Sequence, residues 1–283
     1  MNTHYRGIFV SDLDGTLLRQ GTMSRQDLDA LAELKSEGIL RVIATGRSLH
    51  SATLCLHDEF PTDYLILSTG NQVIDWPARK VLQTYRLGAG EVREVCKLLV
   101  DMDVNFMLHD DFPDNHCFAF HRGRQVNEDF ERRLARNADH ARGWDPEADP
   151  APASQALAIV SPEETGRYDH IRQALSGYSV VRATSPLDGK SIWVEIFAHS
   201  VSKAAGITHI MKHHGLEDAL LGAIGNDHND KEMLDLVHLP YIVNDAFIDP
   251  GHNYISTPAA RSDAVAFAVS HFMEQLHSGM TQR

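Results

Sequence analysis

The pattern of apolar and polar residues divides the chain into strand-like and helix-like segments. Continuous apolar runs, typical of strands buried on both faces of a sheet, occupy residues 7–13, 39–45 and 63–71. Residues 24–38 instead place leucines on one face of a predicted helix, with Ser24 as its N-cap and Gly38 at its end. A further helix is expected between the second and third strands. Because strands alternate with helices, we expect a parallel sheet with helices on both faces.

The pattern changes between residues 79 and 197, where short strand-like runs are more frequent than helical stretches. The strand-like runs are residues 79–85, 104–110, 117–122, 156–161, 178–185 and 191–197. Helices are predicted at residues 91–102, 128–137 and 162–175, and an exposed loop rich in proline, alanine and acid at residues 143–154. Several strands with few helices indicate an α+β module inserted into the first domain.

Helices and strands alternate again from residue 202 onward. The sequence predicts helices at residues 202–215, 229–237 and 262–276, and strands at residues 220–227 and 240–245. The predicted fold class is therefore α/β, with one domain formed by residues 1–83 and 198–283. Residues 84–197 are predicted to form a second, inserted domain.

Composition and charge exclude several classes of protein. The 283 residues are 43% hydrophobic and 23% charged, as in an ordinary globular protein. No apolar run approaches the roughly 20 residues that span a bilayer, and we expect no membrane partner and no signal peptide. The formal net charge of −13 argues against a nucleic-acid partner, because phosphate backbones favour basic surfaces. The three cysteines (Cys55, Cys96 and Cys117) lack a metal-binding spacing and are expected to be reduced in a cytoplasmic protein.

The segment "SDLDGT" carries the first chemical signal. Asp12 and Asp14 lie two positions apart directly after a buried strand, and Gly15 allows the chain to turn. Ligands of parallel α/β sheets bind beyond the carboxyl ends of the strands. A divalent cation would relieve the repulsion between two carboxylates, and hard oxygen ligands suit Mg²⁺. The bland alternative is an acidic surface turn.

Three other segments favour a phosphate site over that alternative. "ATGRS" places Thr45, Gly46 and Arg47 after the second strand, where a hydroxyl and free backbone N–H groups can hold phosphate oxygens. Lys203, in "VSKAAG", lies at the start of a predicted helix. "AIGNDHND" ends another buried strand with a second cluster of oxygen ligands: Asn226, Asp227, Asn229 and Asp230.

These four segments, in this order, resemble the motifs of the haloacid dehalogenase superfamily of phosphatases. "DLDGTLL", "ATGR", "SK" and "GNDHNDKEML" are most similar to its Cof-type subgroup. The resemblance covers nearly the whole chain. It implies a Rossmann-like parallel-sheet core formed by residues 1–83 and 198–283, and a large α/β cap of the C2 type formed by residues 84–197.

The resemblance also implies a mechanism. Asp12 would be the nucleophile that attacks phosphorus and forms an aspartyl-phosphate. Asp14 would protonate the leaving alkoxide and then take a proton from the hydrolytic water. Mg²⁺ and Lys203 would spread the charge of the transferring phosphoryl group. The implied catalytic residues are thus Asp12, Asp14 and Lys203.

The remaining roles implied by the resemblance fall on the same four segments. The phosphate-binding residues would be Thr45, Gly46, Lys203 and Asn229, with Arg47 toward the substrate. The ligands of Mg²⁺ would come from Asp12, Asp14, Asn226, Asp227 and Asp230.

The fourth segment departs from the superfamily pattern. The usual motif reads Gly-Asp-x-x-Asn-Asp, but here Gly225 is followed by Asn226 and then Asp227. The commonest metal-binding acid is therefore an amide. Either Asn226 binds Mg²⁺ directly or Asp227 turns in, and the sequence leaves both open.

Several functional alternatives also remain open. The expected activity is hydrolysis of a small phosphorylated metabolite, with a sugar phosphate as the preferred class. A phosphomutase shares the same chemistry, and a non-catalytic phosphometabolite-binding regulatory protein represents a different class. A metal pair at His209 and His213 lacks an evident third ligand, and a loop that contains His109 and His116 is expected in the cap. The sequence does not determine the oligomeric state.

Overall fold

The computed structural model describes residues 5–164, 166–258 and 263–279. The chain forms two compact units. The first comprises Met1–Arg47, Thr53–Gln83 and Ser202–Arg283, and the second comprises Ser48–Ala52 and Thr84–Val201. Within the described residues, no helix is long and apolar enough to cross a membrane.

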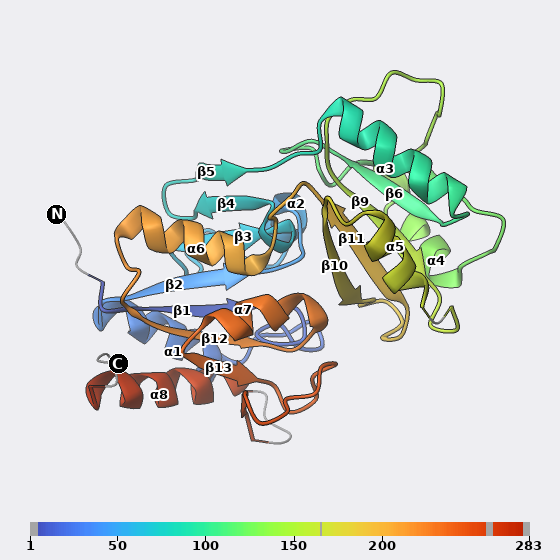
Figure 1. The fold of residues 1–283 in the computed structure, drawn as a ribbon. Helices are drawn as coiled ribbons and strands as arrows, with labels where there is room; N and C mark the ends of the chain where they lie inside the picture. The colour runs from blue at the N-terminus through green and yellow to red at the C-terminus, as the bar shows by residue number, and fades with distance from the viewer. Residues whose placement is uncertain (1–4, 165, 259–262, 280–283) are drawn as a thin grey trace. The chain divides into compact units, whose positions relative to one another are not determined.

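The first unit is built on a sheet of eight strands in the order β14-β13-β12-β1-β2-β3-β4-β5 (Figure 1). All its neighbours from β14 to β3 pair in parallel, whereas β3 and β4 are antiparallel. The strands are β1 (Gly7–Asp12), β2 (Ile39–Ala44), β3 (Tyr64–Leu67), β4 (Gln72–Asp75), β5 (Lys80–Thr84), β12 (Leu220–Gly225), β13 (Leu239–Ile242) and β14 (Ile255–Ser256).

Helices cover this sheet on both faces, as the side chains of β1 show. Ile8 and Val10 belong to a buried cluster that also contains Ile207 of one helix, whereas the ring of Phe9 packs edge-on against Phe272 of another. Fully burying such a side chain stabilises the fold by roughly 1.5–3 kcal/mol. The helices of this unit include α1 (Arg25–Ser36), α6 (Lys203–His214), α7 (Lys231–Leu236) and α8 (Ala264–His277), with short 3-10 turns η1 (Ser68–Gly70) and η3 (His228–Asp230).

The second unit has its own sheet, in the order β10-β11-β9-β6-β7-β8. Its strands are antiparallel except for β7 and β8, which pair in parallel. They are β6 (Phe106–Asp110), β7 (Phe118–His121), β8 (Ala141–Gly143), β9 (Ala153–Val160), β10 (Ser179–Thr184) and β11 (Ile192–Phe197). The helices are α3 (Ala89–Asp101), α4 (Glu128–Arg136) and α5 (Arg167–Ala174), with the turn η2 (Ala138–His140); α2 (Leu49–Thr53) follows the first unit's β2 in the chain.

Helices also cover both faces of the second sheet. Phe106 packs in a buried cluster with Val95 of α3 and Ile171 of α5, whereas Met107 packs with Phe130 of α4 on the opposite face. Neighbouring residues of one strand thus serve two separate hydrophobic layers, since successive side chains point to opposite faces.

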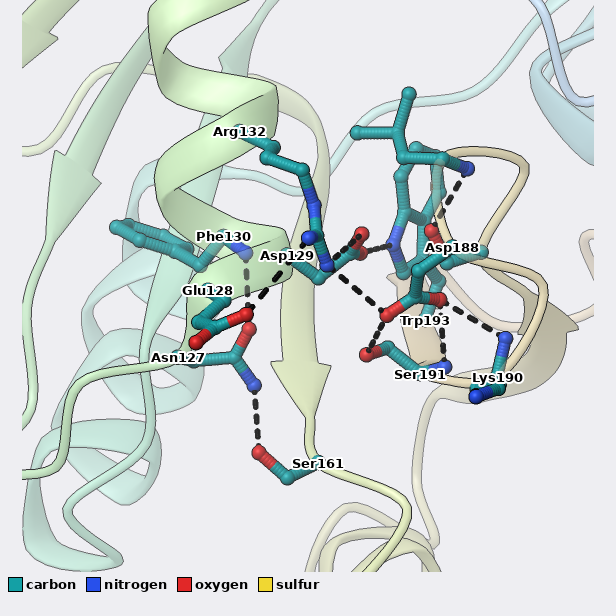
Figure 2. Close-up of polar contacts among 12 residues, drawn as sticks. Asn127, Glu128, Asp129, Phe130, Arg132, Ser161, Asp188, Lys190, Ser191 and Trp193 are labelled. Atoms are coloured by element: carbon teal, nitrogen blue, oxygen red, sulfur yellow. Dashed lines mark hydrogen bonds and ion pairs between the residues drawn. The ribbon is translucent and has the colours of Figure 1, made fainter.

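A polar network ties α4 to the loop that precedes β11 (Figure 2). The indole Nε1 of Trp193 donates to Asp129 Oδ2 at 2.8 Å, and Arg132 forms ion pairs with Asp129 at 3.7 Å and with Asp188 at 3.3 Å. Asp188 in turn accepts from the backbone N–H of Ser191 at 2.9 Å. The side chains of α4 and this loop therefore order each other within the second unit.

The predicted fold class is confirmed: the core has a parallel sheet with helices on both faces, and the middle of the chain is α+β. The predicted N-cap of α1 is also confirmed, because Ser24 Oγ accepts from the N–H of Asp27 at 3.0 Å. Helix α5 is shorter than the predicted 162–175, and the predicted helix 262–276 begins at a residue outside the described ones. The pattern missed β4, and it also missed β8 and β14, which have only three and two residues.

Candidate active site

The site is assembled where neighbouring parallel strands end. Asp12 is the last residue of β1, Thr45 directly follows β2, and Asn226 directly follows β12. The sheet places β1 between β12 and β2, so these three positions lie side by side at one edge. Because parallel strands all end at the same edge, residues more than 200 positions apart in the chain converge there.

Lys203 joins two acids of this edge. Its Nζ donates to Asp12 Oδ1 at 2.6 Å and to Asp230 Oδ1 at 2.6 Å. The lysine and Asp230 have no exposed side-chain surface, and Asp12 is 4% exposed. Lys203 is the first residue of α6, whose N-cap Ser202 accepts from the N–H of Ala205. The start of helix α6 thus places a lysine between the carboxylates of Asp12 and Asp230.

Burial and charge shift the pKa values of this group in opposite directions. Burial is the main cause that raises the pKa of Asp12 to about 8; the Asp230 carboxylate raises it further, and Lys203 opposes both. Burial alone would lower the pKa of Lys203, but the carboxylates of Asp12 and Asp230 raise it above its ordinary value. Two carboxylates therefore face one ammonium group, and a further cation would favour ionised Asp12.

Asp230 also organises the loop after β12. Its Oδ2 accepts from the N–H groups of Asn226 at 2.8 Å and Asp227 at 3.1 Å. Gly225 is required beside it, because a Cβ at this position would lie 2.6 Å from the carboxyl carbon of Asp230. One buried carboxylate thus orients both Lys203 and the loop.

The side chains of Asn226 and Asp227 have different surroundings. The Asn226 amide lies against the Asp12–Thr16 loop: a Cβ on Gly15 would come within 2.3 Å of Nδ2, and Thr16 Oγ1 donates to Oδ1 at 3.4 Å. Asp227 instead caps its own turn, with Oδ1 accepting from the N–H of His228 at 2.7 Å. Both side chains are largely buried, and the Asn226 amide contacts the first motif.

Arg47 forms a bidentate ion pair with Asp14. Its Nε lies 2.8 Å from Asp14 Oδ2 and its NH2 lies 2.6 Å from Asp14 Oδ1. The hydrogen bond to Asp14 is the main cause that raises the pKa of Arg47. The structure therefore places Arg47, predicted to face the substrate, against the second aspartate of the first motif.

Backbone bonds hold Thr45 between the second and third strands. Its N–H donates to the carbonyl of Ile66 at 2.8 Å, its carbonyl accepts from Thr69 at 3.0 Å, and its Oγ1 accepts from Arg47 N–H at 3.1 Å. Thr45 is fully buried and the adjacent Gly46 is exposed. Both backbone groups of Thr45 are therefore bonded within the unit, and the part of Thr45 and Gly46 in phosphate binding stays a prediction.

Sequence reasoning missed Gly70 as part of the site's framework. Its φ is +110°, and a Cβ there would lie 2.1 Å from the carbonyl oxygen of Ser202. The loop after β3 therefore packs directly on the residue before Lys203. The glycine of "LSTGN" indicates a turn after β3. The sequence does not indicate its contact with Ser202, which is 132 positions away in the chain.

For three residues singled out in the sequence, Asn229, His209 and His213, the structure gives no contact that supports the predicted or considered role within the part of the chain that it describes. Asn229 lies half-buried in η3, between His228 and Asp230, and its part in phosphate binding stays a prediction. His209 and His213 on α6 are not brought together with a third metal-binding side chain among the described residues. The three cysteines are free thiols, as predicted.

A divalent cation fits the residues at this edge. Asp12 Oδ2 is buried and has no hydrogen-bond partner, while Oδ1 is taken by Lys203. An unpaired carboxylate oxygen, an amide oxygen of Asn226 against the first motif and an excess of negative charge suit Mg²⁺.

Comparisons with known proteins find relatives over most of the chain. The family model for haloacid dehalogenase-like hydrolases matches residues 9–248. A provisionally named phosphatase from Mycoplasma pneumoniae is 23% identical over 247 residues, which cover 81% of this chain and 83% of that protein.

Two solved structures share the fold. BT1666 from Bacteroides thetaiotaomicron, a phosphatase of the superfamily, aligns with a TM-score of 0.74 at 20% identity, covering 95% of this chain and 96% of that one. The subclass IIB sugar phosphatase BT4131 aligns with a TM-score of 0.75 at 19% identity, covering 94% and 99%.

The family model spans most of the chain and includes all four segments, of which three follow β1, β2 and β12 and the fourth begins α6. The predicted superfamily is confirmed, and with it the prediction of an enzyme of that class. The chain belongs to the family of haloacid dehalogenase-like hydrolases.

Proposed function

We propose that this protein is a Mg²⁺-dependent phosphomonoester hydrolase that acts on a small phosphorylated metabolite through an aspartyl-phosphate. The observation that carries the proposal is the pairing at Asp12. Lys203 holds one oxygen of its carboxylate at 2.6 Å, and the other oxygen is buried and unpaired at the carboxyl edge of the sheet. A carboxylate held in this way presents one oxygen to an electrophile.

In the proposed reaction, Asp12 attacks phosphorus through Oδ1, the oxygen that Lys203 orients, and Oδ2 is the oxygen that would face the ion. The bond to the leaving alkoxide breaks, and the alkoxide receives a proton from Asp14. Asp14 then takes a proton from the water that hydrolyses the aspartyl-phosphate. Lys203 stays within reach of the phosphoryl oxygens through its contact with Asp12.

The ion pair between Asp14 and Arg47 gives this scheme a specific requirement. Asp14 must release Arg47 before it can carry a proton, because both of its oxygens accept from the guanidinium. Release would leave Arg47 with donors for an anionic ester, in line with its predicted place near the substrate. Substrate binding and activation of Asp14 are thereby coupled in the proposal.

The proposed ligands of Mg²⁺ are the unpaired oxygen of Asp12, the backbone carbonyl of Asp14 and the amide oxygen of Asn226. Asn226 is preferred to Asp227 because it contacts the first motif, whereas Asp227 caps its turn. Asp230 contributes by holding Lys203 and the loop. When bound, the ion would neutralise charge on the transferring phosphoryl group.

Sugar phosphates are the proposed substrate class. BT4131, which shares the fold across nearly the whole chain, is a sugar phosphatase. The net charge of −13 disfavours polyanionic partners such as nucleic acid, but a single phosphate needs only the local cations of this site.

A screen of phosphate esters with and without Mg²⁺ tests the proposal. We expect release of inorganic phosphate from a small ester, dependent on Mg²⁺ and abolished by Asp12→Asn. Asp29→Asn, an exposed acid on α1, is the matched control and should retain activity. An isomerised ester without net phosphate release would instead identify a phosphomutase. Tight ester binding without turnover would identify a binding protein.

A further inference from the structure

A group of side chains that could hold a metal ion also lies in the second unit, and none of its members is assigned above. It consists of His116, Cys117 and His140. Cys117 directly precedes β7 and His140 directly precedes β8, and these strands pair in parallel with Phe118 opposite Ala141. Parallel pairing therefore brings the two residues together, although they are 23 positions apart in the chain.

The three side chains converge on a small volume. One ligand atom from each lies within 4.8 Å of the others, and Cys117 Sγ is 3.9 Å from His140 Nδ1. The rings of His116 and His140 have centroids 4.9 Å apart and are nearly perpendicular, at 78°. A perpendicular arrangement is compatible with two imidazoles that point at one ion, and it is also a common geometry of packed rings.

The distances suit a tetrahedral ion. Zn–S and Zn–N bonds of about 2.3 and 2.05 Å at tetrahedral angles place sulfur and nitrogen roughly 3.6 Å apart. The observed 3.9 Å separation between Cys117 Sγ and His140 Nδ1 is within a small rotamer adjustment of that value. All three side chains are half-buried, so the cluster is partly shielded from solvent and still accessible to an ion.

Both acidic and basic side chains surround this cluster. The Nδ1 atom of His116 is buried without a hydrogen bond of normal geometry. The carboxylates of Asp110 and Asp114 act on Cys117, and Arg142, which pairs with Asp110 at 2.9 Å, offsets part of that charge. A cation at the cluster would satisfy the orphaned nitrogen.

Local backbone bonds hold the ligands in place. The N–H of Cys117 donates to the carbonyl of Asp114 at 2.8 Å, and its carbonyl accepts from Asp110 at 3.0 Å. The N–H of His140 donates to the carbonyl of Asn137 at 2.9 Å. The two turns that carry the ligands are thus ordered, which lowers the cost of assembling a site.

We propose that His116, Cys117 and His140 form a Zn²⁺ site in the second unit, with the fourth position open to water. Two imidazoles and a thiolate suit zinc, while the oxygen ligands around Asp12 suit Mg²⁺. The ion would join the starts of β7 and β8. This site is independent of the proposed phosphatase chemistry.

Cobalt is the probe that tests the proposal, because a thiolate bound to Co²⁺ gives an intense near-ultraviolet charge-transfer band. The full chain is reduced, treated with chelator, saturated with Mg²⁺ and titrated with Co²⁺. We expect one equivalent to produce the band, and Zn²⁺ to abolish it by displacement. Co²⁺ at the oxygen ligands of the first unit gives no such band, so the two sites are distinguished without measuring activity.

Variants identify the ligands. Cys117→Ala should abolish the band, and His140→Ala should weaken Zn²⁺ binding by at least about tenfold, since one of three ligands is lost. Cys55→Ala and His209→Ala are matched controls from the first unit and should retain both properties. Circular dichroism verifies that each variant is folded. A wild-type titration without the band, or a band that survives Cys117→Ala, would overturn the proposal.

Discussion

The two units both bury charged side chains, but they balance the charge differently. In the first unit, Asp12 and Asp230 share a single cation, Lys203, and Asp12 Oδ2 has no partner. In the second unit, Asp129 Oδ2 accepts from an indole N–H, and Asp129 Oδ1, which also lacks a hydrogen bond to the described residues, lies 3.7 Å from the guanidinium of Arg132 one turn away on α4. The first group is short of a positive charge, whereas the second has its counter-charge on the same helix.

A second arginine of α4, Arg133, also lies beside this group. The guanidinium of Arg133 lies 4.4 Å from the centre of the Trp193 ring. Burial lowers the pKa of Arg133 to about 10, against the opposing charges of Glu195 and Asp129, so the group stays charged near neutral pH. Charge pairs built within one helix and its neighbour order a fold. Charges collected from three distant elements and left unbalanced indicate a site that awaits a ligand.

Asp12→Asn should have the largest effect, because it removes the proposed nucleophile from the charged group of the first unit. The amide cannot attack phosphorus, and we expect kcat to fall by at least about 10⁴-fold. Phosphate release from the preferred ester, measured with Mg²⁺ saturating, checks the prediction. Asp29→Asn should keep wild-type turnover, and retention of activity by Asp12→Asn would refute the nucleophile.

Asp14→Asn separates proton transfer from nucleophilic attack. Loss of a general acid typically costs about 10²–10⁴-fold in rate, and we expect a fall of this size in kcat. The deficit should shrink for esters whose leaving groups need no proton, such as p-nitrophenyl phosphate. An equal deficit for both kinds of ester would contradict the assigned role.

Lys203→Met tests the buried ions of the first unit as a structural element. Removing one partner of a buried ion pair costs about 3–5 kcal/mol, because the remaining carboxylates are left uncompensated. Urea unfolding should show this loss in the free energy of unfolding. Lys212→Met, an exposed lysine on the same helix, should be nearly neutral. A loss below about 1 kcal/mol in the Lys203 variant would mean that the pair is not buried in solution.

Asp129→Ala tests the locally balanced group of the second unit. The indole N–H of Trp193 would lose its acceptor, which costs about 1–3 kcal/mol of stability. Asp129→Asn keeps an acceptor oxygen and should cost less. Unfolding of both variants, followed by tryptophan fluorescence, checks the order. The Mg²⁺ dependence of phosphate release should be unchanged in both, since this group balances its charge without an ion.

Asn226→Asp should have the smallest effect, and it tests whether the loop after β12 holds the ion of the first unit. A carboxylate in place of the amide adds one anionic ligand beside Asp12, and we expect Mg²⁺ to activate at a lower concentration, by about tenfold. Asp227→Ala should weaken activation less, through loss of its cap on His228. Asp218→Ala is an exposed control from the same unit. Unchanged activation by Mg²⁺ in both loop variants would show that this loop does not hold the ion.

The sequence by itself determined the fold class and the main chemical segments. Apolar runs that end in Asp12, Thr45 and Asn226 predict parallel strands, and parallel strands end at one edge whatever the details of packing. That topological rule is why residues so far apart could be assigned to one site. Lys203 was assigned through the family resemblance, since a single lysine at a helix start has no distinguishing pattern.

Only the tertiary structure decided how the members of the site are paired. It placed Arg47 on Asp14, the Asn226 amide against the first motif, and Gly70 beneath Ser202. Each of these depends on side-chain rotamers or on a contact between loops. Periodicity along a chain carries no information about either.

The cluster of His116, Cys117 and His140 shows the same limit more clearly. Its cysteine has no metal-binding spacing in the sequence, and the interpretation of the three cysteines as simple free thiols rested on that. Strand pairing between β7 and β8 sets Cys117 beside His140. The register of two short strands is a property of the folded sheet, because the hydrophobic pattern of three or four residues is too brief to specify it.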